Sequence, residues 1–281
     1  MPLIYRVDYY FGVTMSPIMK QAIKPFYFAG ISFFLLTPFS ASAGECYGQS
    51  ATHKVALLEL YTSEGCSSCP PADQWLSNLA DGQFEEQQVV PLALHVDYWN
   101  YLGWKDPYSD KAYSKRQRRQ GDVNNLRTVY TPQFVLNGED LRGWYKRNGT
   151  DGPIEKVNSE TAKATIELTL EKRSAASLSV AASVELSEGQ SADGYGLYLA
   201  LFENGLVSDI PRGENTGKIL HHDHVVRQLI GPYKLAGQSG SLSENFALDA
   251  TWKGENLGVA AFVQNAKTGD VLQALMIKNC S

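Results

Sequence analysis

Two cysteines separated by two serines are the residues of this chain whose types and spacing point most directly to chemistry. Cys66 and Cys69 follow Val55–Tyr61, a short apolar run typical of a buried strand, and precede Pro70–Leu79, where apolar residues recur at helical spacing. Cys-x-x-Cys in this context is typical of a redox-active dithiol. Free N–H groups at a helix N-terminus stabilise a thiolate, so we expect Cys66 to be the attacking sulfur and Cys69 the more buried, resolving sulfur.

Two other interpretations of the pair stay open. A Cys-x-x-Cys can form half of a structural zinc site, but the other two cysteines, Cys46 and Cys280, stand alone, so we predict no metal and no cofactor. The pair can also be a permanent structural disulfide. Pro70 and Pro71 lack an N–H, so either the helix begins near Pro70 or its first turn is distorted, and both alternatives weaken the argument for a Cys66 thiolate.

The N-terminal segment is typical of a secretory signal peptide. Met19–Lys24 carries two positive charges, the 15 residues of Pro25–Phe39 are uncharged and mostly apolar, and Ala41-Ser42-Ala43 has small residues where a signal peptidase cuts. The apolar run is shorter than the roughly 20 residues of a membrane span. We therefore predict cleavage after Ala43, a periplasmic or secreted protein, and no stable membrane anchor after cleavage.

The net charge of the chain and the compartment it is exported to limit the classes of molecule that it can bind. Residues 1–43 contain three basic side chains and one acidic side chain, so the rest of the chain holds 22 basic and 29 acidic side chains, a net charge of −7. This balance disfavours nucleic acid as a partner, and the basic run at 115–119 is interpreted as a solvated helix face. Export places all four cysteines in an oxidising compartment, where a structural disulfide between Cys46 and Cys280 is the simplest pairing of the two ends.

The pattern of hydrophobic residues changes near residues 146–160, where we place a linker. Before it, strand-like runs alternate with helix-compatible segments, and Asn137-Gly138 marks a hairpin turn. After it, seven short β-type runs separated by turn residues favour a sandwich: Ala164–Leu170, Leu178–Leu186, Gly196–Phe202, His224–Ile230, Asn245–Thr251, Gly258–Val263 and Val271–Ile277. The predicted domains are 44–152 and 153–281, after the upstream extension and signal peptide of 1–43.

Longer motifs carry a family resemblance. They are Glu59–Asp73, His95–Trp99, Gly103–Asp106, Tyr130–Gln133, Arg212–Asn215 and His224–Arg227. With them the chain resembles the DUF1223 family, exported bacterial proteins of unknown function, and its cysteine segment resembles the thioredoxin-like superfamily. The resemblance implies a thioredoxin-like fold more firmly than an activity. With the strand pattern after residue 160, the predicted fold class is an α/β thioredoxin-like domain followed by an all-β, sandwich-like C-terminal domain. With the Cys-x-x-Cys pair, the leading hypothesis is a thiol–disulfide oxidoreductase whose partners are protein thiols or disulfides, or a redox partner protein.

The resemblance extends to three further residues. Thr131-Pro132 matches the cis-proline that thioredoxin-like proteins place opposite the cysteines, where the backbone of the preceding residue pairs with an extended substrate. Glu59 matches the buried carboxylate that relays a proton to the resolving cysteine, although it lies one residue further from the motif than usual. The other interpretation of Glu59 is a solvent-facing residue of an edge strand.

Histidines offer an alternative chemistry. His221, His222 and His224 form a short cluster, and imidazole beside cysteine sulfur is typical of copper sites, although nothing in the sequence brings the cluster near Cys66. His95 lies in an apolar run and is interpreted as a core residue with satisfied hydrogen bonds.

Aromatic residues gather after that run. They are Tyr98, Trp99, Tyr101, Trp104 and Tyr108, and they suit a substrate groove or a packed core equally well. Three functions thus follow from the sequence. The first is a thiol–disulfide oxidoreductase, the second a non-catalytic periplasmic binding protein with a static disulfide, and the third a copper-binding module.

Overall fold

Strands dominate the structure, a computed structural model that describes Gly12 and residues 45–79, 84, 85, 87–146, 149 and 151–278. The strands in this part of the chain are β1 (Glu45–Gln49), β2 (Ala56–Thr62), β3 (Val89–His95), β4 (Gln133–Leu136), β5 (Glu139–Leu141), β6 (Ala164–Ser174), β7 (Ser177–Leu186), β8 (Tyr195–Glu203), β9 (Leu206–Asp209), β10 (Ile219–His222), β11 (Val225–Lys234), β12 (Ser239–Ala247), β13 (Leu257–Asn265) and β14 (Val271–Lys278). The helices are α1 (Pro70–Asn78), α2 (Lys111–Val123), α3 (Asp151–Asn158) and the short 3-10 turns η2 (Asn100–Leu102) and η3 (Gly254–Asn256). None of the described helices has the length and apolar character of a membrane span.

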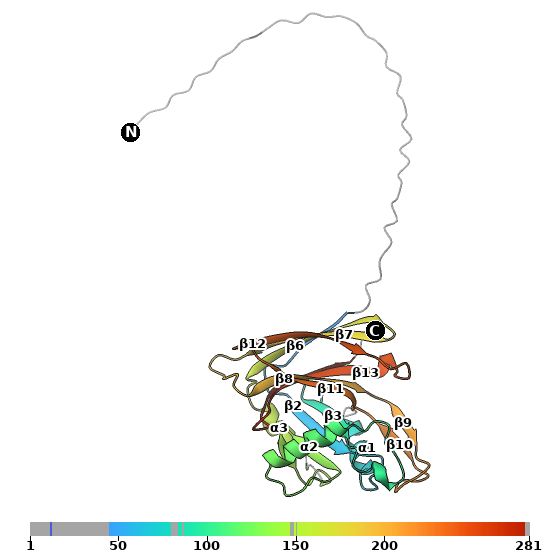
Figure 1. Ribbon diagram of the computed structural model, residues 1–281. Coiled ribbons are helices and arrows are strands. Elements are labelled where there is room, and N and C mark those ends of the chain that lie inside the picture. Colours follow the sequence, from blue (N-terminus) through green and yellow to red (C-terminus); the bar gives the residue numbers. More distant parts are fainter. Residues whose placement is uncertain are drawn as a thin grey trace, which may run out of the picture. The chain divides into compact units, whose positions relative to one another are not determined.

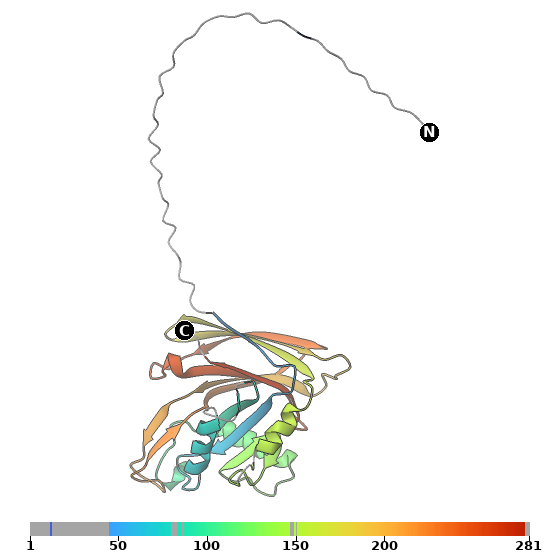
Figure 2. The same cartoon turned by 180° about the vertical axis from the view of Figure 1, so that it is seen from behind.

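Two sheets form the layers of the fold. The larger has eight strands in the order β14-β13-β8-β11-β3-β2-β4-β5, and the smaller has four in the order β1-β6-β7-β12. Figure 1 shows the smaller sheet stacked on the β8 and β13 part of the larger one, with the helices gathered around its β2 and β3 part. The same arrangement is seen from behind in Figure 2. Strands β9 and β10 form a separate two-stranded ribbon.

Side-chain alternation along the strands explains the layers. Strand β7 alternates buried and half-exposed positions, because only one of its faces meets the larger sheet. Strands β2, β3 and β13 are buried at every position, because both of their faces are covered. On β2, Leu58 and Leu60 pack with Leu76 of α1, whereas Leu57 and Tyr61 point to the opposite face, in the cluster that includes Tyr113 of α2.

The predicted fold class is wrong. An α/β thioredoxin-like domain followed by an all-β, sandwich-like domain would have kept the strands of the two halves in separate sheets. Instead β2 to β5 share one mainly β architecture with β8, β11, β13 and β14, and β1 joins the smaller sheet by pairing with β6. The physical reason is that the outer edge of β3 pairs with β11, so the first half does not complete a sheet of its own.

The strand predictions themselves hold better than their assembly. Each of the seven runs predicted after residue 160 overlaps a strand, although the segment at 245–251 begins earlier, as β12. The turn at Asn137-Gly138 is confirmed between β4 and β5, with φ angles of 48° and 89°. A side chain at Gly138 would overlap the carbonyl oxygen of Gly269, so glycine is required there. The described residues from Glu45 to Lys278 belong to one compact unit.

Two predictions fall on residues that the structure leaves undescribed. The signal peptide lies within residues 1–43, and Cys280 lies beyond the last described residue. Cys46 is buried on β1, and β1 packs near β14, since Gly48 abuts Ile277. The Cys46–Cys280 pairing stays a prediction.

A buried ion pair crosses the core of the larger sheet. Arg116 of α2 donates to both carboxylate oxygens of Glu59 on β2, at 2.5 and 3.0 Å, and also to Gln264 at 2.7 Å. Its guanidinium lies 5.2 Å from the ring centroids of Tyr198 and Phe262. Despite burial, the charge of Glu59 holds the pKa of Arg116 above its usual value. Within the basic run, therefore, Arg116 is not a solvated residue as predicted, whereas Arg118 is exposed.

We expect Glu59→Gln to lower the free energy of unfolding by about 3–5 kcal/mol, because it leaves the guanidinium buried without a counter-charge. The double variant Glu59→Gln/Arg116→Met should recover most of this loss. The matched control Arg118→Met should stay within about 0.5 kcal/mol of the parent. Urea unfolding followed by circular dichroism measures all three. Equal stability of Glu59→Gln and the parent protein would contradict the assignment.

Candidate functional site

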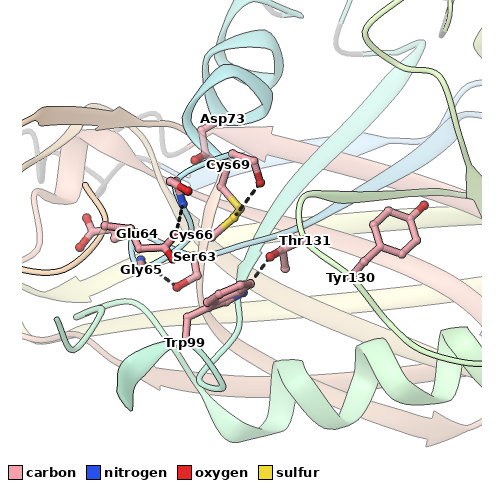
Figure 3. Close-up of a disulfide and its surroundings, with 12 residues drawn as sticks. Ser63, Glu64, Gly65, Cys66, Cys69, Asp73, Trp99, Tyr130 and Thr131 are labelled. Atoms are coloured by element: carbon pink, nitrogen blue, oxygen red, sulfur yellow. Dashed lines mark hydrogen bonds between the residues drawn. A yellow bond between two sulfur atoms is a disulfide. The ribbon is translucent and has the colours of Figure 1, made fainter. Parts of the chain in front are cut away.

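The cysteine pair lies in the connection between β2 and α1. Cys66 and Cys69 form a disulfide with a Cα–Cα distance of 5.4 Å, and Figure 3 shows it between the start of α1 and Thr131. The two sulfur-bearing residues are 1% and 0% exposed, so Cys66 is as buried as Cys69, unlike the prediction. The serines between them are exposed, so the tip of this loop faces solvent while its base is buried.

The start of α1 decides between the two alternatives for the prolines. The helix begins at Pro70, with Cys69 as its N-cap residue. Pro70 and Pro71 lack N–H groups, and the next two N–H groups, those of Ala72 and Asp73, donate to the carbonyl oxygen of Cys69 at 2.8 and 3.1 Å. The first turn therefore has no free N–H to stabilise a thiolate on Cys66, and the helix-terminus argument does not apply to this site.

Residues from the second half of the chain hold the cysteine loop. The side-chain amide of Asn215, which is fully buried, donates to the carbonyl oxygens of Glu64 and Cys66 at 2.8 and 3.0 Å. Glu214 accepts a hydrogen bond from the N–H of Ser67 at 3.1 Å, and the side chain and the N–H of Ser67 together lower the pKa of Glu214. The motif at 212–215 is thus hydrogen-bonded to the motif at 59–73, although the two are about 150 residues apart in the sequence.

A surface groove lies beside the disulfide. It encloses about 530 Å³ and is lined by Ser68, the segment Tyr130–Pro132 and the segment Leu141–Tyr145. The Thr131–Pro132 peptide bond is cis, as predicted, and Thr131 accepts a hydrogen bond from the indole of Trp99 at 2.8 Å. The structure therefore brings Thr131 and Pro132 together with the Cys-x-x-Cys loop.

The aromatic residues that the sequence singled out surround the site rather than line this groove. Trp99 packs against Gly65, since a Cβ there would lie 3.0 Å from its Cβ, and Trp104 donates to Glu64 at 2.7 Å. Tyr108 lies edge-on to two histidines. The groove takes its aromatic character from Tyr130, which belongs to the motif at 130–133, and from Trp144 and Tyr145, which belong to none of the motifs.

A buried polar cluster lies on the inner side of the cysteine loop. It consists of Glu64, Asp73, His95, Asp106 and His222, each no more than 5% exposed. His95 Nδ1 donates to Asp106 Oδ2 at 2.7 Å, and His222 Nε2 lies 3.2 Å from Glu64 Oε1. The rings of the two histidines meet edge-to-face at 5.1 Å. Glu64 precedes Cys66 by two residues and Asp73 follows Cys69 by one helical turn, so the cluster is built on the same loop and helix as the disulfide.

Burial and neighbouring charges shift the titration of this cluster. Burial raises the pKa of Asp73. For His95, burial opposes protonation, but the charge and hydrogen bond of Asp106 outweigh it and raise the pKa. For Asp106, burial is in turn outweighed by His95, and the pKa is lowered.

Three predicted residues have surroundings that differ from the prediction. Glu59 is buried, as one interpretation expected, but its carboxylate pairs with Arg116, and it lies on the sheet face opposite α1, the helix that Cys69 caps. Its role as a proton relay stays a prediction. On one continuous strand His222 and His224 would share a face, but β10 ends at His222, and His224 has a φ of 57°.

The model of the DUF1223 family, described as a protein of unknown function, matches residues 57–264. The chain belongs to the DUF1223 family. No curated protein matches this DUF1223 chain at a significant level.

Two solved structures are similar to the DUF1223 fold described above. HBP35 of Porphyromonas gingivalis has a TM-score of 0.62 and 18% identity, covering 82% of this chain and 76% of its own. Protein AGR_C_4864 from Agrobacterium tumefaciens has a TM-score of 0.53 and 25% identity, covering 82% of this chain and 96% of its own. The first likeness shows the fold alone. Together they show that the combined two-sheet architecture exists in experimental structures.

Sequence reasoning missed Glu64, Asp73 and Asp106 as members of a site. Glu64 and Asp73 belong to the longest motif of the DUF1223 resemblance, and Asp106 ends another. Of the three, only Asp73 lies in a helix, in its first turn, whereas Glu64 and Asp106 lie in loops, so no periodic pattern marks them as buried. His95 is a core residue as predicted, but its Nε2 has no hydrogen-bond partner among the described residues, so its hydrogen bonds are not all satisfied.

We expect Asn215→Ala to loosen the cysteine loop, because it leaves the carbonyl oxygen of Glu64 buried without a donor and leaves that of Cys66 with the N–H of Cys69 alone. Unfolding free energy should fall by about 1–3 kcal/mol. The disulfide should also be reduced faster by dithiothreitol, measured by thiol alkylation and mass spectrometry. The exposed neighbour Thr216→Ala serves as the control and should reduce at the parental rate. An Asn215→Ala protein that is also reduced at that rate would show that this contact does not hold the loop.

Proposed function

We propose that this DUF1223 protein is an exported thiol–disulfide oxidoreductase that uses Cys66 and Cys69 on protein substrates. The observation that carries the proposal is the placement of the disulfide loop at a groove formed with Thr131 and the cis-proline Pro132. Ser68 lines the groove, and its hydroxyl lies 3.4 Å from Cys66 Sγ. One exposed residue thus separates the groove from the sulfur.

The groove suits an extended peptide. The backbone N–H and C=O of Thr131 make no hydrogen bond with the described residues, so both are free to pair with a substrate strand. The three aromatic side chains of the groove offer apolar surface to the residues that flank a substrate cysteine. The only charged side chain in its lining is Arg142, which pairs with Asp140, so the groove favours no strongly charged sequence.

The exchange conserves atoms and electrons. A substrate thiolate attacks Cys66 Sγ, the Cys66–Cys69 bond breaks, and Cys69 leaves as a thiolate that takes a proton. A second substrate thiolate then attacks the mixed disulfide and releases Cys66. The substrate gains one disulfide and loses two electrons, which reside in the two protein thiols. The same bonds form and break in reverse when the reduced protein acts on a substrate disulfide, and a second dithiol or disulfide protein closes the cycle.

Burial of both sulfurs favours a second candidate, a binding protein with a static disulfide. At 1% exposure, Cys66 can be attacked only after the tip at residues 67 and 68 moves. The tip contacts the exposed Glu214 through the N–H of Ser67 and contacts Cys66 Sγ through the Ser68 hydroxyl, so its movement breaks only weak contacts. The base of the loop is held by the buried Asn215.

Trapping separates the two candidates. A Cys69→Ser protein made in cells should accumulate mixed disulfides through Cys66, seen as reducible adducts on non-reducing gels and identified by mass spectrometry. The double variant Cys66→Ser/Cys69→Ser is the matched control and should form none. A reduction potential above about −300 mV against glutathione is expected for turnover. No adducts, with a potential below that value, would identify a static disulfide and end the proposal.

A separate experiment tests the proposed export and the cleavage of the signal peptide. The protein recovered from the periplasmic fraction or culture medium should begin at Gly44, as read from the mass of its N-terminal peptide. Recovery of the uncut chain in the cytoplasm would contradict export.

A further inference from the structure

We propose that Asp73, His95 and His222 form a binding site for one divalent transition-metal ion, separate from the disulfide. The ligand atoms that these three side chains offer all lie within 4.8 Å of one another. Two imidazoles and one carboxylate are a ligand set that suits Zn²⁺, Cu²⁺, Ni²⁺ or Fe²⁺ and not the alkaline-earth ions. The proposal does not depend on turnover of the cysteines.

The strongest observation is a convergence of unsatisfied buried atoms. His95 Nε2, His222 Nδ1 and both carboxylate oxygens of Asp73 are buried, and none has a hydrogen-bond partner among the described residues. Native structures leave few buried polar atoms in this condition, and four at one place call for an explanation. A ligand that contacts all of them at once provides it.

The hydrogen bonds on the far side of each ring fix the tautomers that a metal needs. His95 Nδ1 donates to Asp106, which leaves the lone pair of Nε2 for the cluster, and His222 Nε2 donates to Glu64, which leaves the lone pair of Nδ1. Carboxylates behind the ligating histidines are the usual second layer of metal sites. Glu64 and Asp106 are themselves fixed by hydrogen bonds from Trp104 and from backbone N–H groups.

The distances suit a shared cation better than direct contact. His222 Nδ1 and Asp73 Oδ2 are 3.9 Å apart, beyond the about 2.7–3.2 Å of a hydrogen bond. Around a tetrahedral ion with bonds of about 2.0–2.1 Å, two ligand atoms are about 3.3 Å apart. The ligands therefore need to close by about 0.6 Å for this pair and by at most about 1.5 Å for the widest one, which small side-chain rotations achieve.

The negative charge of the buried carboxylates also favours a bound cation. Glu64, Asp73 and Asp106 are buried together, and among the described residues their only ion pairs are with the two histidines. Buried carboxylates are costly without compensation. A divalent ion offsets two charges at the point where the unsatisfied atoms meet.

The site can be reached from solvent. A pocket of about 550 Å³ is lined by Asp73, Gln74 and Ser77 of α1 on one side and by the segment Leu220–His224 on the other. Two of the three proposed ligands, Asp73 and His222, are part of this lining. The pocket gives an ion a path and leaves room for a water as a fourth ligand.

Calorimetric titration of the metal-free protein with Zn²⁺, and separately with Cu²⁺, tests the site. We expect one equivalent to bind, and Co²⁺ to give the visible absorption bands of a low-coordinate site. Asp106→Asn should weaken binding about 10–100-fold, and His222→Ala and Asp73→Asn should weaken it by more. His221→Ala, an exposed neighbour, is the matched control and should bind as the parent does.

Folding and redox function are checked alongside. Circular dichroism of each metal-free variant shows whether it is folded, and Asp73→Asn keeps the shape of the side chain if His222→Ala does not fold. Cys66→Ser/Cys69→Ser should still bind one equivalent, so failure of the oxidoreductase proposal leaves this result intact. The absence of stoichiometric binding for every ion, or binding that His221→Ala weakens as much as His222→Ala, would overturn the proposal and leave protons as the compensating charge of the cluster.

Discussion

The pairing of β3 with β11 is the constraint on which the rest of the molecule depends. It is a short parallel contact, in which Ala93 lies opposite Val225 and the N–H of Ala93 donates to the carbonyl oxygen of His224 at 2.8 Å. Through this contact two sets of four strands become one eight-stranded sheet. The same contact carries His222, two residues before His224, to the end of β3, where His95 is the last residue. The pairing of β3 with β11, called the junction below, therefore determines both the fold and the position of the polar cluster.

The junction also explains which parts of the fold can be predicted from the sequence. The strands of the second half are visible as short runs of apolar residues, and Asn137-Gly138 is visible as a turn, because these are local patterns. Strand partners are not local. Both β8 and β13 are almost wholly apolar, which indicates burial on both faces but does not say between which neighbours. The resemblance of the cysteine segment to thioredoxin-like proteins suggested strand neighbours within two separate domains. The pairing of β3 with β11 shows that this assignment of neighbours is wrong.

The residues of the candidate site also fall into two groups, those that local motifs reveal and those that only tertiary contacts bring together. The cysteines, Thr131 and Pro132 could be found from short motifs, because a Cys-x-x-Cys pair and an X–Pro dipeptide carry their own signal. The pairing of Glu59 with Arg116 could not, since the two are 57 residues apart and nothing in the strand pattern shows which face of β2 meets α2. Nor could the cluster of Glu64, Asp73, His95, Asp106 and His222. Its members come from two loops, a helix and two strands, and each looks ordinary until the junction places them together.

The disulfide and the polar cluster share one scaffold but not one environment. Cys69 and Asp73 are four residues apart at the start of α1, and therefore lie on the same side of the helix. Because the prolines remove two N–H groups and Cys69 accepts the next two, the helix start contributes no donor to a thiolate on Cys66. A cysteine in this setting must gain any thiolate stabilisation elsewhere. The side-chain partner of Cys66 Sγ is the Ser68 hydroxyl, whereas the cluster side chains contact one another, Trp104 and backbone N–H groups. The two features are therefore held in place by the same loop and helix, but each has its own hydrogen-bond partners.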